Sequence, residues 1–156
     1  MRAPVGRVHV DAELPLVHRV AQRALDALPA GAAPAEPDES AVALIIEAEG
    51  RAVGDINLFE IDVRNRRASI GLSIWRQEDR GRGYGTDAMR ALLGWAFREY
   101  NLHRVELSVD PSNTAAIRVY EKLGFAHEGR RREAHYTGGT FVDDVMMGLL
   151  RGDFLE

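Results

Sequence analysis

The chain has 156 residues, of which 46% are hydrophobic and 28% charged, and its formal net charge is -4 at pH 7. These values are typical of one globular domain over residues 1–156, and they exclude a disordered, collagen-like or membrane-spanning chain. The absence of cysteine excludes disulfides, a cysteine nucleophile and cysteine-based metal sites. The acidic balance argues against sequence-independent binding of nucleic acid.

The first 41 residues contain one predicted helix and one predicted loop. Apolar residues recur at three- and four-residue spacing along residues 12–28, which predicts an amphipathic helix. Residues 30–40 contain a glycine and two prolines among small and acidic residues, so we expect a loop there. No apolar block of secretory type follows the basic residues of the N-terminus, and we therefore expect a cytoplasmic protein.

Three strands are predicted next. The β-type runs 42–48 and 53–59 are separated by the turn residues 49–51, and a third run, 68–75, follows a polar turn. Consecutive strands joined by short turns favour an antiparallel meander. A helical stripe of apolar residues from Ala88 to Tyr100 follows.

The chain then returns to β structure. An alternating strand over residues 104–110 follows the helical stripe, so a strand, a crossover helix and a strand form a βαβ unit, and we expect its two strands to be parallel. Asn113 is a suitable N-cap for a second helix, which is expected to stop at Gly124. The tail contains three β-type runs that predict a final hairpin and an edge for a possible homodimer, over residues 125–129, 132–137 and 141–150.

The segment from Arg80 to Thr86 lies between a predicted strand and a predicted helix. Its glycines let the backbone turn tightly, and the unpaired N–H groups at a helix N-terminus favour an anion such as phosphate. The spacing matches neither a P-loop nor the Rossmann fingerprint. Taken alone, the glycines are equally well explained by a flexible turn.

Two signatures in this region resemble those of the GNAT superfamily of N-acyltransferases. Arg80, Gly83 and Gly85 match its acyl-CoA pyrophosphate loop, Gln/Arg-x-x-Gly-x-Gly/Ala. The next helix matches the signature Asn-x-x-Ala…Tyr-x-x-x-Gly-Phe, through Asn113, Ala116, Tyr120, Gly124 and Phe125. The two signatures occur in the order and separation that the superfamily shows.

The resemblance extends over about residues 42–150. Residues 57–68 and 139–147 are similar to the branch that acetylates ribosomal-protein N-termini and spermidine, whereas residues 1–41 match poorly. The resemblance implies an α/β fold: a mixed, mostly antiparallel sheet with a splayed central pair of parallel strands and helices on both sides.

The resemblance also implies direct transfer of an acetyl group from acetyl-CoA to an amine. Tyr120 matches the family tyrosine that protonates the departing thiolate, and a phenol with a pKa of about 10 suits a thiol leaving group of about 8.5. A core aromatic role is the alternative for this residue. The implied contacts to acetyl-CoA are Ser73, Ile74, Trp75, Arg80, Gly81, Arg82, Gly83, Tyr84, Gly85, Thr86, Asn113 and Tyr120.

The sequence leaves open which residue is the general base and which amine accepts the acetyl group. Glu106, Ser108 and Asp110 alternate onto one face of their strand, and some N-terminal acetyltransferases have a glutamate at the position of Ser108. We therefore assign the base to Glu106 or to a bound water. The five histidines lack metal-ligand spacing, so no metal is expected. A ribosomal-type protein N-terminus is the preferred acceptor; a polyamine, an aminoglycoside-like amine, an aminoacyl conjugate and a non-catalytic acyl-CoA sensor remain open.

Overall fold

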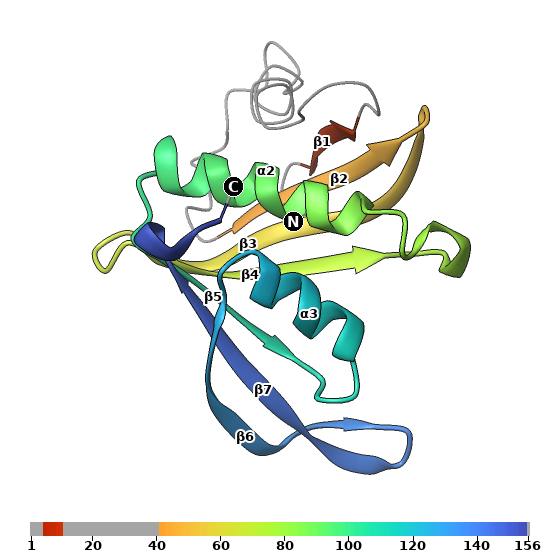
Figure 1. The fold of residues 1–156 in the computed structure, drawn as a ribbon, viewed down its shortest axis with the longest axis vertical. Coiled ribbons are helices and arrows are strands. Elements are labelled where there is room, and N and C mark those ends of the chain that lie inside the picture. Colours follow the sequence, from red (N-terminus) through yellow and green to blue (C-terminus); the bar gives the residue numbers. More distant parts are fainter. Residues whose placement is uncertain (1–4, 11–40, 156) are drawn as a thin grey trace.

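The computed structural model describes residues 5–10 and 41–155, and the predicted helix 12–28 and loop 30–40 lie outside them. Within the described residues, seven strands form one sheet in the order β1-β2-β3-β4-β5-β7-β6 (Figure 1). The strands are β1 Val5–Val10, β2 Ala41–Ala48, β3 Arg51–Asp62, β4 Arg67–Ile74, β5 Arg104–Val109, β6 Ala126–Thr137 and β7 Thr140–Leu150.

The strand directions agree with the sheet predicted from the sequence. β2, β3 and β4 form the antiparallel meander, and β5 lies parallel to β4 after the crossover helix. β7 is antiparallel to both β5 and β6, so most neighbouring pairs are antiparallel. β1, which pairs in parallel with β2, was not predicted, because its apolar residues Val5, Val8 and Val10 do not alternate strictly.

The two described α-helices are α2, Tyr84–Arg98, and α3, Thr114–Lys122. Helix α2 begins one turn before the apolar stripe that predicted it, because left-handed Gly83 with φ 87° forms its N-cap. Helix α3 begins after Asn113, whose side chain accepts a hydrogen bond from the Ala116 N–H, as predicted. Short 3₁₀ turns occur at Gln77–Asp79 and Arg151–Asp153.

The C-terminal β structure differs in one respect from the prediction. The two runs predicted over 125–129 and 132–137 are one strand, β6, interrupted by irregularities after His127 and after Arg131. Glu133 is in the left-handed region with φ 50°, so the strand continues past a bulge. The run of polar residues at this bulge has no apolar alternation, which is why the sequence pattern broke there.

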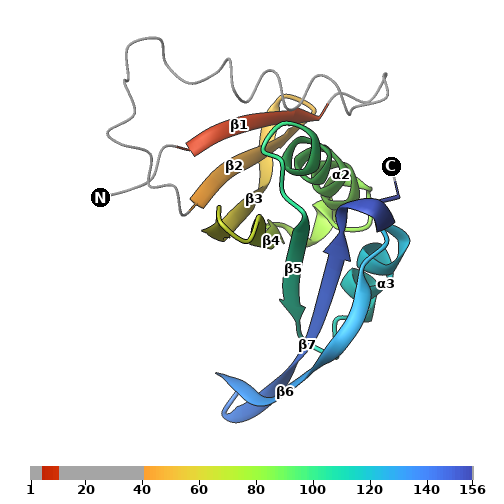
Figure 2. The same ribbon diagram turned by 90° about the vertical axis from the view of Figure 1, so that its left-hand side faces the viewer.

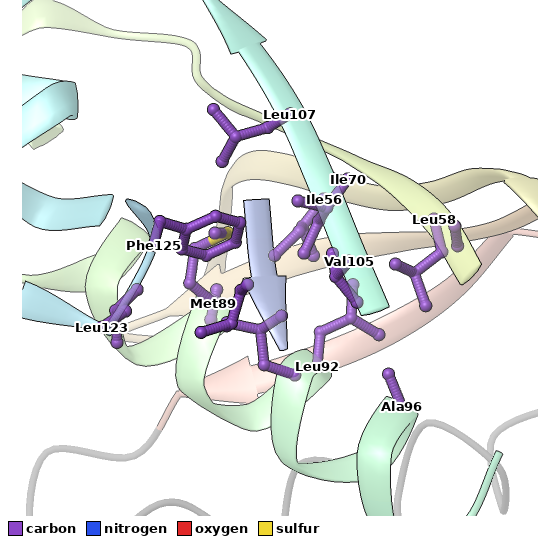
Figure 3. Close-up of a cluster of buried hydrophobic side chains, with 14 of the residues drawn as sticks. Ile56, Leu58, Ile70, Met89, Leu92, Ala96, Val105, Leu107, Leu123 and Phe125 are labelled. Atoms are coloured by element: carbon purple, nitrogen blue, oxygen red, sulfur yellow. The ribbon is translucent and has the colours of Figure 1, made fainter. Parts of the chain in front are cut away.

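One hydrophobic cluster holds the sheet and both helices together (Figure 3). Met89 and Leu92 of α2 pack with Ile56 and Ile70 of the meander and with Val105 of β5. Each fully buried side chain of this size contributes about 1.5–3 kcal/mol. Figure 2 shows that β5, β7 and β6 turn away from β1–β4, so the core bridges two arms of one twisted sheet.

None of the helices in the described part of the chain is both long enough and apolar enough to cross a bilayer.

Candidate active site

A cleft opens where β4 and β5 separate. The two strands pair at three positions, the last being Ser69 opposite Glu106, and β4 continues to Ile74 without β5 beside it. The separation of the two arms is visible in Figure 2. The cleft has a volume of about 460 Å³ and is lined by Leu72, Ser73, Ile74, Asp79, Arg80, Gly81, Gly83, Tyr84, Gly85, Thr86, Asn113, Ala115, Ala116, Val119 and Tyr120.

The hydrogen-bonding register of β4 decides which backbone groups face this cleft. The Trp75 N–H donates to the Val53 carbonyl at 3.0 Å, so Trp75 directs its backbone groups toward β3. Residues alternate in an antiparallel strand, and Ser73 therefore also faces β3. The backbone groups of Leu72 and Ile74 point to the opposite side, where β5 has departed.

This register refines the predicted set of backbone contacts. The cleft receives the polar backbone of Leu72 and Ile74, and the Ile74 carbonyl accepts a hydrogen bond from Arg80 Nε at 3.3 Å. Ser73 lines the cleft, but Trp75 does not. Trp75 is 49% exposed, and its Nε1 donates to Asp55 at 2.6 Å.

The glycines around the start of α2 have different roles. Gly81 and Gly83 have φ of 73° and 87°, with open space where a side chain would project, so they are needed for backbone conformation. Gly85 lies close to β4: a Cβ there would be 3.0 Å from Leu72 Cδ2, so the leucine side chain would have to shift. The Asp87 N–H donates to the Gly83 carbonyl, so the N–H groups of residues 84–86 have no partner within the helix and are available to an anion.

Arg82 and Tyr84 are held together beside the cleft. Both donate hydrogen bonds to Glu49 Oε1 at 3.0 Å, and the Arg82 guanidinium lies 5.3 Å from the centre of the Tyr84 ring. Burial, together with the hydrogen bond to Glu49, raises the pKa of the Tyr84 phenol. Tyr84 lines the cleft as predicted, whereas Arg82 does not.

Asp79 is a cleft residue that the sequence did not indicate. The residue is only 1% exposed, and both terminal nitrogens of Arg51 donate to its carboxylate, Nη1 to Oδ2 at 2.8 Å. The hydrogen bond from Arg51 lowers the pKa of the Asp79 carboxyl, which is therefore a carboxylate at neutral pH. No sequence pattern links these residues, because they are 28 positions apart.

Tyr120 of α3 lines the same cleft as the first turn of α2. Its ring packs against Phe125 with 5.8 Å between ring centres, and the side chain is half-buried. Its hydroxyl has no hydrogen-bond partner among the described residues. Burial raises the pKa of the phenol, so it remains protonated and able to donate a proton throughout the neutral range.

Of two further residues predicted for the site, Asn113 lines the cleft and Glu106 does not. Asn113 lines the cleft with its Oδ1 bonded to the Ala116 N–H at 3.2 Å, so it caps the helix beside the site. Glu106 is not among the lining residues. It accepts a hydrogen bond from Arg104 Nε at 3.0 Å and lies 3.7 Å from Arg67 Nη1, so two arginines already balance its charge.

No group of His, Asp and Glu side chains within residues 5–10 and 41–155 is arranged to hold a metal ion. The fold and the cleft together define an α/β domain in which helix N-terminal amides and the Tyr120 phenol line one cleft.

Residues 10–126 match the acetyltransferase (GNAT) domain family, and the chain belongs to this family. The spermidine N(1)-acetyltransferase of Escherichia coli K12 is 30% identical over 118 residues, which are 76% of this chain and 63% of that protein. A Bacillus subtilis protein, YdaF, described as a candidate ribosomal N-acetyltransferase, is 36% identical over 106 residues, which are 68% of this chain and 57% of that protein. The chain thus spans less than two thirds of the length of these relatives.

Solved structures give the same family assignment. The crystal structure of spermidine N-acetyltransferase from Vibrio cholerae in complex with CoA and spermine superimposes with a TM-score of 0.70 and 28% identity, over 76% of this chain and 70% of that one. A dodecameric structure of the same Vibrio cholerae enzyme has a TM-score of 0.69 at 28% identity, over 74% of this chain and 67% of that chain.

Proposed function

We propose that this chain is an N-acetyltransferase that moves an acetyl group from acetyl-CoA to a primary amine of a small cationic molecule. The observation that carries the proposal is the cleft lined by the end of β4, the start of α2 and helix α3, with unpaired helix amides and the free Tyr120 hydroxyl on its wall. Family membership supports the same reaction class.

The cleft residues suit the successive parts of acetyl-CoA. The N–H groups of residues 84–86 and the positive end of the α2 dipole favour the diphosphate. The backbone groups of Leu72 and the N–H of Ile74, which lie beyond the last β4–β5 pair, can bind the amide-containing pantetheine arm as an added strand would. The predicted contacts of Ser73, Gly81 and Asn113 fit this path, whereas Arg82 and Trp75 lie beside it.

Acetyl transfer requires a carbon–nitrogen bond to form and the carbon–sulfur bond to break. As the amine nitrogen attacks the thioester carbon, negative charge develops on the carbonyl oxygen, and the Leu72 N–H is a preorganised donor for it. Tyr120 then gives its proton to the departing sulfur. The phenol suits this step because its raised pKa keeps the proton in place until a thiolate forms.

The attacking amine must first lose a proton, because an alkylamine with a pKa of about 10 is mostly protonated at pH 7. Glu106 remains the proposed acceptor of this proton, through a water molecule. Its carboxylate is held by ion pairs with Arg104 and Arg67 and does not line the cleft, so a water molecule must connect it to the amine. Replacement of Glu106 therefore tests a definite assignment.

The proposed acceptor differs from the one preferred from the sequence. Proteins named spermidine N(1)-acetyltransferase from Escherichia coli and Vibrio cholerae are 30% and 29% identical to this chain. These relatives support a small polyamine-like amine over a protein N-terminus. The similarity to YdaF keeps an N-terminal peptide as the second candidate.

The test is a thiol-release assay with acetyl-CoA and a panel of amines: spermidine, spermine, an aminoglycoside, and peptides beginning with alanine or serine. Turnover with polyamines at a kcat/KM at least tenfold above that with peptides is the expected result. Turnover with peptides alone would reverse the acceptor assignment. CoA binding by calorimetry without turnover of any amine would favour the acyl-CoA sensor.

Assembly and location remain proposals as well. The dodecameric Vibrio cholerae neighbour supports an oligomer, and pairing of two copies through the C-terminal strands is the arrangement proposed here. Light scattering of the purified chain measures the number of copies. A cytoplasmic location is consistent with the use of acetyl-CoA.

A further inference from the structure

The loop between β4 and α2, residues 75–83, is attached to the body of the protein mainly by polar contacts. Asp79 is its single buried residue; the other members are exposed. Gly81 and Gly83 have open space around the position of a Cβ. Hydrophobic packing therefore does not fix this loop, although it leads directly to the amides that face the cleft.

Arg51 attaches the buried member of the loop to the sheet. It is the first residue of β3 and pairs with Ala48 across the β2–β3 hairpin, so its backbone belongs to a rigid element. Its two terminal nitrogens hold both carboxylate oxygens of Asp79. A paired, planar contact of this kind fixes orientation as well as distance.

The turn at residues 49–51, which we call the clamp turn, makes a second attachment. Glu49 and Gly50 are left-handed, with φ of 51° and 76°, and form a tight turn. Glu49 accepts hydrogen bonds from Arg82 and from the Tyr84 hydroxyl and so holds the chain after Gly81, whereas Arg51 holds Asp79 before it.

The charges of these residues matter for an anionic ligand. Asp79 lines the cleft, and an unbalanced carboxylate there would repel a diphosphate. Arg51 balances that charge at hydrogen-bond distance, and Arg82 Nη1 adds a weaker contact at 4.0 Å. The Arg51–Asp79 pair therefore gives the loop a buried anchor without leaving net negative charge in the cleft.

We infer that Arg51 and Asp79 are positioning residues for the acetyl donor: their ion pair sets the β4–α2 loop so that the amides at the start of α2 meet the diphosphate. Arg51 acts through Asp79 and the loop backbone. This inference rests on the proposed function, because it concerns the donor end of the same cleft.

The experiment compares acetyl-CoA with S-acetylpantetheine, a donor that carries the same thioester without phosphates. Arg51→Gln is expected to raise the KM for acetyl-CoA at least about tenfold with kcat within about threefold, and to leave the KM for S-acetylpantetheine unchanged. Asp79→Asn, which leaves no unpaired buried charge, is expected to raise the acetyl-CoA KM about three- to fivefold. The double variant should bind CoA more tightly than Arg51→Gln alone.

Glu78→Gln is the matched control, because Glu78 is the exposed acidic neighbour of Asp79 and its replacement should change neither donor's KM. Equal increases in KM for both donors would indicate general damage to the site and overturn the inference. An unchanged acetyl-CoA KM in Asp79→Asn would overturn it even if Arg51→Gln does not fold. Failure of the wild-type chain to bind CoA in calorimetry would instead overturn the proposed function.

Discussion

Replacement of Tyr120 by phenylalanine separates catalysis from stability more cleanly than any other change in the cleft. The ring contact with Phe125 is retained, and the lost hydroxyl has no hydrogen-bond partner among the described residues. We therefore expect the free energy of unfolding to change by less than about 0.5 kcal/mol and the Tm by less than about 2 °C. Loss of a general acid costs about 10²–10⁴ in rate, so kcat should fall at least about 100-fold, equivalent to about 2.7 kcal/mol.

The assay is thiol release at saturating acetyl-CoA and amine from pH 6 to 11. The wild-type rate should rise as the amine deprotonates and decline only above pH of about 10, because the buried phenol loses its proton above its usual pKa. Tyr120→Phe should lack that decline. A kcat within threefold of wild type would refute the assignment of Tyr120 as the acid, and a large fall in Tm would show that the hydroxyl has a structural partner.

Three further changes test other parts of the site. Gly83→Ala forces a left-handed conformation on a residue with a Cβ, which costs about 1–2 kcal/mol of conformational free energy. CoA binding measured by calorimetry should weaken about tenfold. An unchanged affinity would show that Gly83 is not part of the CoA-binding loop. Glu106→Gln should lower kcat at least about tenfold at pH 7, and by less at pH 10, where the amine deprotonates without a base. Glu128→Gln is the control, because it removes only another partner of Arg104. A similar loss of kcat in Glu128→Gln would assign the effect to the ion-pair network. In Gly124→Ala, the added Cβ would lie 2.1 Å from the Asp153 carbonyl oxygen. We therefore expect a loss of about 2 kcal/mol or more in the free energy of unfolding, measured as a Tm lower by at least about 4 °C. An unchanged Tm would contradict the observed packing.

Much of the fold could be read from local patterns. The meander, the crossover helix, the N-cap at Asn113 and the stop at Gly124 were all predicted, because each depends on residues close together in the sequence. The bulged strand β6 was predicted in two pieces, since its central polar run has no alternation. The parallel strand β1 was missed because only its pairing with β2 identifies it.

The sequence by itself determined the family signatures, the glycine-rich turn before α2 and the presence of Tyr120 on the next helix, because short-range backbone and spacing rules govern all three. Only the tertiary structure decided that Leu72 and Ile74, and not Trp75, direct their backbone groups into the cleft, because strand register sets that choice. It also paired Glu106 with arginines and buried Asp79 against Arg51. Contacts between residues far apart in the chain arise from packing, and no local pattern encodes them.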